Sequence, residues 1–86
     1  MFVTKQDVAE KIAAHLQHRI TLPQLVDWAE SAMMDAAFDE KDAATIASVV
    51  GRLGVADVRA FGLTWTDCEE LLAKLGFSAR VEIVAA

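Results

Sequence analysis

Apolar residues recur along this chain at intervals of three and four, the spacing that places them on one face of an α-helix. The pattern predicts four main helices, over residues 5–19, from residue 22 or 23 onward, over residues 40–53 and over residues 65–75. The inward faces are predicted to hold Val8, Ala9, Ile12, Ala13, Leu16 and Ile20; Leu25, Trp28, Ala29, Ala32, Met33 and Ala36; Ala43, Ile46, Ala47, Val50 and Leu53; and Cys68, Leu71, Leu72 and Leu75.

The start of each predicted helix carries the same local signal. A side-chain oxygen that can cap the first turn is followed three residues later by a polar acceptor, and an apolar residue precedes the cap. Together these features are typical of a capping box with a hydrophobic staple. The four cap and acceptor pairs are Thr4–Asp7, Thr21–Gln24, Asp39–Asp42 and Thr64–Asp67. Because Asp is shorter than the usual Glu or Gln, we expect a strict box only at Thr21–Gln24.

Glycines indicate where the third and fourth main helices end. Gly54 is expected directly after the third helix, with Val55 making the apolar contact of a Schellman ending. Gly76 is expected to end the fourth helix in the same way, with Phe77 packing back onto it. Between these two helices, residues 56–61 predict one further short turn of helix.

After the last helix the hydrophobic period changes from helical to alternating, which is typical of a strand. Phe77, Ala79, Val81 and Ile83 alternate with Ser78, Arg80, Glu82 and Val84. A single strand has no hydrogen-bond partner of its own. Three arrangements are open: pairing with residues 1–3, pairing with a second copy or another protein, or lying extended across the helices.

Short joints near residues 19–21, 37–39 and 62–64 require consecutive helices to fold back on one another. Small side chains on the predicted inner faces permit the helices to approach closely. We therefore predict a single all-α domain over residues 1–86. It is a compact bundle of four main helices plus one short helix, with a short extended C-terminal segment.

Composition narrows the classes of function. Apolar residues make up 55% of an 86-residue chain, and a domain of this size has too much surface to bury all of them. The excess predicts a surface for a protein partner or for self-association. The net charge of −5, from 13 acidic and 8 basic residues, opposes binding to nucleic acid and to anionic membranes.

The sequence contains no signal-like N-terminus and no uncharged apolar run of membrane-spanning length. The single cysteine, Cys68, cannot close an intrachain disulfide. A cytoplasmic location without membrane attachment is therefore expected.

Few residues suggest chemistry. His15 and His18 are three positions apart on one predicted helix, but a zinc site needs three or four ligands with a supporting shell. Cys68 belongs to an apolar stripe, which favours an inert core thiol over a nucleophile. We find no phosphate loop, nucleophile elbow or cysteine-rich metal motif. We therefore expect no enzyme activity, no cofactor and no bound metal.

Candidate partner-binding residues fall into two kinds. An acidic cluster around the turn between the second and third helices predicts a surface for a basic partner. Trp65 begins the fourth helix, where a half-exposed tryptophan is a frequent interface anchor. The apolar positions of the C-terminal segment add a strand that could pair. The residues selected are Asp35, Asp39, Glu40, Asp42, Trp65, Val81 and Ile83.

The leading hypothesis is a non-catalytic domain that binds another protein or itself. One alternative is a DNA-binding helix-turn-helix over residues 56–75, although its second helix would carry net negative charge into the major groove. Another is a toxin-neutralising protein. In size, charge and layout the chain resembles small acidic helical proteins of this kind, such as bacteriocin immunity proteins, without a shared motif.

Overall fold

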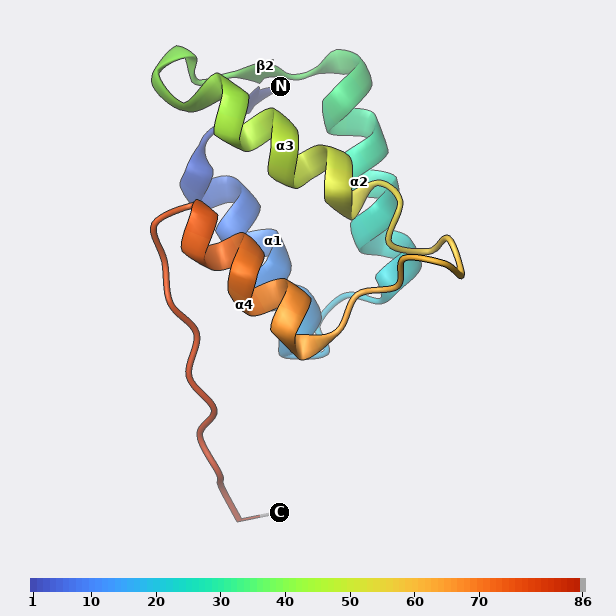
Figure 1. Cartoon of the computed structure of the whole chain (residues 1–86), viewed down its shortest axis with the longest axis vertical. Coiled ribbons are helices and arrows are strands. Elements are labelled where there is room, and N and C mark those ends of the chain that lie inside the picture. The colour runs from blue at the N-terminus through green and yellow to red at the C-terminus, as the bar shows by residue number, and fades with distance from the viewer. Residues whose placement is uncertain (86) are drawn as a thin grey trace.

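The computed structural model describes residues 1–85 (Figure 1). Its elements, in chain order, are β1 (Phe2–Val3), α1 (Lys5–Leu16), α2 (Leu22–Asp35), β2 (Ala37–Phe38), the 3₁₀ turn η1 (Glu40–Asp42), α3 (Ala43–Leu53) and α4 (Trp65–Lys74). The helices surround one apolar core, and the chain then leaves α4 as an extended segment. The predicted compact helical bundle of four main helices is therefore confirmed.

Three threonines set the starts of α1, α2 and α4. Each threonine Oγ1 accepts a hydrogen bond from the amide of the third helical residue, and that residue's side chain accepts from the threonine amide in return. The return bonds measure 2.9 Å from Thr4 to Asp7, 2.8 Å from Thr21 to Gln24 and 2.9 Å from Thr64 to Asp67. Aspartate closes the box as well as glutamine does, so the expectation of one strict box is wrong.

The fourth predicted cap, Asp39, does not form a box. Its amide donates to the carbonyl of Val3 at 3.0 Å, so that amide is not available to Asp42. Its carboxylate instead accepts from the Lys41 amide at 3.3 Å and caps η1. The α-helix consequently begins at Ala43 and not at residue 40.

The hydrogen bond from Asp39 belongs to a two-stranded parallel sheet that the hydrophobic pattern did not predict. Phe2 pairs with Ala37, and Val3 pairs with Phe38. The side chain of Val3 is buried in the core. Residues 1–3 are therefore occupied by the α2–α3 connection and do not pair with the C-terminal segment.

The ends of the helices depart from the expectations in two places. Helix α1 ends at Leu16, not at residue 19, because His18 adopts a left-handed backbone with φ of 61°. The amide of Arg19 then donates to the carbonyl of Ala14 at 2.9 Å, which completes a Schellman ending without glycine. Gly54 has a right-handed φ of −64°, so the Schellman ending predicted there is absent.

Beyond Gly54 the chain continues in consecutive turns, and the short helix predicted over residues 56–61 is not formed. These turns end at Gly62, which has a φ of 62°. At the end of α4 the prediction holds. Gly76 has a φ of 89°, and the amide of Phe77 donates to the carbonyl of Leu72 at 2.9 Å.

The core confirms most of the predicted inner faces, including Cys68, Leu71 and Leu72 of α4 and Leu75 directly after it. Met33 is the clear error, because its side chain is 51% exposed. Val26 and Val49 are buried although neither was placed on an inner face. Helix α3 contacts α1, α2, α4 and β2, so its buried face is wider than one helical stripe. Among residues 1–85, no helix is both long enough and apolar enough to cross a membrane.

We expect Leu71→Ala to lower the free energy of unfolding by about 2–5 kcal/mol, because the substitution leaves a cavity in the core. Urea denaturation followed by tryptophan fluorescence measures this loss. Met34→Ala is the control, since Met34 is exposed on α2 and its truncation should change stability by less than about 0.5 kcal/mol. Equal effects of the two substitutions would contradict the assigned core face of α4.

Candidate functional site

A groove of about 620 Å³ lies between α1 and the C-terminal segment. Its floor is made by Ala9, Ala13 and Leu16 of α1 together with Leu72 of α4. Helices α1 and α4 pack against each other, and the small side chains of Ala9 and Ala13 leave room for the groove above them. Trp65, residues 77–82 and the polar side chains of Gln6, Glu10 and Gln17 form the walls.

The left-handed turn at Gly76 creates this arrangement. It reverses the chain after α4, so that the segment runs back past the start of the same helix (Figure 1). Ala79 packs against the core and holds the first part of the segment to the bundle. Val81 and Trp65 thereby line the same groove, although they are sixteen residues apart in the chain.

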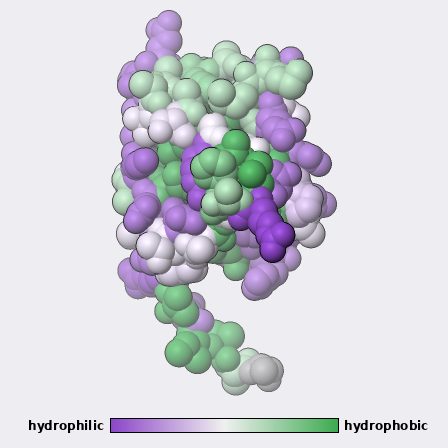
Figure 2. Space-filling view, turned by 45° about the vertical axis from the view of Figure 1, so that its right-hand side comes forward, coloured by the Kyte–Doolittle hydropathy of each residue, from purple (hydrophilic) through white to green (hydrophobic). Residues whose placement is uncertain are grey.

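Residues 78–85 are extended and belong to no helix or strand. Within the described part of the chain, their backbone groups make no hydrogen bond with other backbone groups. The exposed fraction is 69% for Val81 and 94% for Ile83. Figure 2 shows the apolar colour of this segment where it extends beyond the body of the molecule. An unpaired backbone and exposed apolar side chains therefore occur in the same place.

Trp65 and Phe77 are the two aromatic residues of the groove, and each is 40% exposed. Trp65 is the first residue of α4, and the Thr64–Asp67 capping box fixes the backbone that carries it. The expectation that Trp65 is half exposed is therefore confirmed. Its position beside other apolar groups is the setting in which tryptophan contributes most to protein interfaces.

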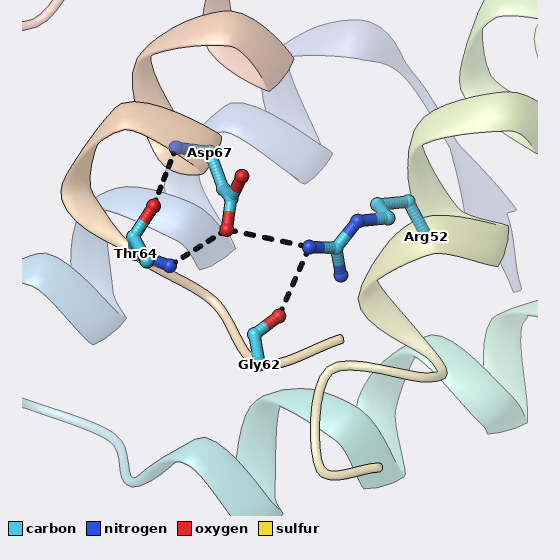
Figure 3. Close-up of polar contacts among 4 residues, drawn as sticks. All are labelled: Arg52, Gly62, Thr64 and Asp67. Atoms are coloured by element: carbon cyan, nitrogen blue, oxygen red, sulfur yellow. Dashed lines mark hydrogen bonds and ion pairs between the residues drawn. The ribbon is translucent and has the colours of Figure 1, made fainter. Parts of the chain in front are cut away.

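A side-chain clamp fixes the start of α4 to α3 (Figure 3). One Arg52 nitrogen, Nη2, donates to the carbonyl of Gly62 at 3.0 Å and to Asp67 Oδ2 at 3.3 Å. The same carboxylate oxygen accepts the Thr64 amide. The Arg52 guanidinium also lies 5.9 Å from the centre of the Phe61 ring. Arg52, directly before the turns between α3 and α4, thus holds the residues at their far end.

The clamp changes the acidity of Asp67. Hydrogen bonds from the Thr64 backbone and side chain lower the pKa of Asp67, and the positive charge of Arg52 lowers it further. Sequence reasoning identified Asp67 only as a capping residue and did not identify Arg52. The two residues are fifteen positions apart and on different helices, so no periodic pattern connects them.

The four acidic candidates lie elsewhere. Asp35 ends α2, Asp39 follows β2, and Glu40 and Asp42 belong to η1, at the opposite end of the bundle from the start of α4 (Figure 1). Asp39 caps η1, and Asp42 forms an ion pair with Lys5 at 3.6 Å. Asp35 and Glu40 are exposed. The seven candidate residues therefore form two separate surfaces, and none of the four acidic residues lines the groove beside Trp65.

The histidines and the cysteine do not come together. His15 is half-buried near the end of α1, whereas His18 is exposed in the turn that follows. Cys68 is buried, and this burial raises the pKa of its thiol, to which the nearby charge of Asp67 adds. Across residues 1–85, no three His, Cys, Asp or Glu side chains are grouped so that they could hold a metal ion.

The helix-turn-helix interpretation of residues 56–75 loses its first helix, because residues 56–61 form turns. Only α4 remains of the two-helix unit that this interpretation requires.

Comparisons of the chain with protein-family models, with curated proteins and with solved structures found no match.

We expect Asp67→Asn to flatten the dependence of stability on pH. The folded protein holds the pKa of Asp67 below its ordinary value of about 3.9. The stability that the Asp67 charge contributes is therefore complete above the ordinary pKa. It is lost as the pH falls through the lower pKa of the folded protein. Urea midpoints at pH 7 and pH 3 measure this change. The wild-type protein should lose more stability than the variant does.

Asp57→Asn is the control, since Asp57 is exposed in the turns after α3. This variant should keep the wild-type dependence on pH. Parallel curves for wild type and Asp67→Asn would show that the clamp does not stabilise the folded protein through the Asp67 charge.

Proposed function

We propose that this protein is a non-catalytic protein-binding domain, and that its binding surface is the groove with the C-terminal segment beside it. One observation supports the proposal most directly. Residues 78–85 combine an unpaired backbone with exposed apolar side chains, directly beside an apolar groove that contains Trp65. Exposed apolar surface of this kind is typical of interaction sites.

The chemistry of the segment also suggests how it binds. An extended segment with unpaired amides and carbonyls can add to another strand, and its alternate side chains then contact one surface. The apolar positions 79, 81 and 83 are on that one face. Ala79 packs against the core and Val81 lines the groove, whereas Ile83 extends beyond it and is 94% exposed.

The acidic residues at the other end of the bundle give the protein a preference for basic partners, but they do not form a second binding site. Asp35 and Glu40 are exposed there, and the chain has a net charge of −5. Such a surface attracts basic proteins at a distance and repels nucleic acid and anionic membranes. The cytoplasmic location expected from the sequence stays a prediction.

We expect the double substitution Val81→Ser with Ile83→Ser to abolish binding of partners that the wild-type chain captures in the cell that produces it. The matched control is Met33→Ser with Met34→Ser, because these side chains are also exposed but lie on α2, away from the groove. Quantitative cross-linking mass spectrometry compares the partners captured by the wild-type chain and by the two double variants. An isotopically labelled copy of the chain is added, so that self-association is also counted.

Partners that are lost with the segment variant and kept with the α2 variant would support the proposal. If the wild-type chain retains no protein that the segment variant loses, the proposal is wrong. Circular dichroism of both variants should match the wild type, because all four substituted side chains are exposed.

A further inference from the structure

The order of side chains in the C-terminal segment makes it complementary to itself. In an antiparallel pair of two copies, a two-fold axis through Val81 places Val81 opposite Val81 and Ala79 opposite Ile83. Residues directly opposite each other share a face of the ribbon. All the apolar positions from 79 to 83 would therefore lie on one face.

Charge selects this register over its neighbours. With the axis at Val81, Arg80 of each copy lies opposite Glu82 of the other, so both charge pairs are attractive. A shift of two residues places Arg80 opposite Arg80 or Glu82 opposite Glu82. A shift of one residue places the apolar face of one copy with the polar face of the other. Parallel, in-register pairing also places like charges side by side.

Neither charged residue has an ion-pair partner within residues 1–85, and both line the groove with exposed side chains. Arg80 and Glu82 are adjacent to Val81 on either side, so in a paired strand they would lie on the face opposite Val81. A second copy supplies each with an opposite charge without a change of the fold.

Pairing would also use the groove. An isolated two-stranded ribbon is marginally stable in water, so the apolar face of the ribbon must be covered. Ala79 already contacts the core, and Val81 lines the groove. The partner's Ile83 would stand opposite Ala79, with the two Cβ atoms about 5 Å apart. The most exposed large side chain of the segment would thus be carried over the groove of the other copy.

We infer that the partner of the segment is a second copy of this chain, and that residues 78–84 of two copies pair antiparallel about a two-fold axis at Val81. This inference rests on the proposed function, since it names the protein that the groove and segment bind. The resulting contact is closed, because each copy contributes the same surface to the other.

A charge exchange tests the register with full-length chains. In Arg80→Glu, Glu would face Glu82 twice, and in Glu82→Arg, Arg would face Arg80 twice. Each variant alone should dimerise at least about tenfold more weakly than wild type. An equimolar mixture should recover wild-type affinity as a mixed dimer, because both opposing pairs are then Glu with Arg. Sedimentation equilibrium and native mass spectrometry measure the affinity and the composition of the dimer.

Oxidative cross-linking tests the axis independently. Val81→Cys places two thiols opposite each other, so we expect rapid formation of a disulfide-linked dimer. In Ile83→Cys the two thiols are offset by four residues, about 13 Å along the strands. This exceeds the reach of a disulfide, which needs Cα atoms within about 7 Å. The wild-type chain is the control, because its own thiol, Cys68, is buried.

A monomeric wild-type chain up to millimolar concentration would overturn the inference, and so would a dimer whose charge variants do not recover on mixing. Cross-linking that is equal at positions 81 and 83 would also overturn it. These results would not by themselves overturn the proposed function. The proposed function fails if the double variant Val81→Ser with Ile83→Ser keeps every partner that the wild-type chain captures. If this double variant instead loses a protein other than a second copy, the groove and segment remain the binding surface, and that protein is the partner.

Discussion

Burial of the apolar stripe of α4 is the constraint on which the functional surface depends. A helix of ten residues is not stable alone in water, so α4 exists because Cys68, Leu71 and Leu72 are buried in the core. This packing places the two ends of α4 on the surface. Trp65 emerges at one end, and Gly76 reverses the chain at the other. The groove between α1 and the C-terminal segment is the direct consequence of that reversal.

The turns between α3 and α4 show how a long connection is held without a helix of its own. Arg52 donates to the carbonyl of Gly62 and to the carboxylate of Asp67, which also closes the capping box. One side chain of α3 therefore supports both the first turn of α4 and the backbone at Gly62, three residues before it. The position of Trp65 depends on this support, although Arg52 does not itself line the groove. A positioning role of this kind is found only when the two helices are seen together.

Local signals were reliable where the groups they involve have no other partner. The caps at Thr4, Thr21 and Thr64 formed as the sequence predicts. The Asp39 box failed because the sheet uses its amide first. His18 ended α1 early although nothing in its residue type required a left-handed backbone, whereas Gly54, which permits one, stayed right-handed. At Asp39 a hydrogen bond from elsewhere in the fold outweighed the local preference, and at Gly54 the chain continued into further turns.

The sequence by itself determined the number of main helices, three of their starts, the core face of α4 and the apolar alternation after Gly76, because these depend on neighbours within a few residues. It also singled out Trp65, Val81 and Ile83 one at a time. Only the tertiary structure placed Trp65 and Val81 on one groove and moved the acidic residues to the other end of the bundle. Periodicity reports which face of an element is apolar. Which faces meet is decided by packing between elements that are distant in the chain.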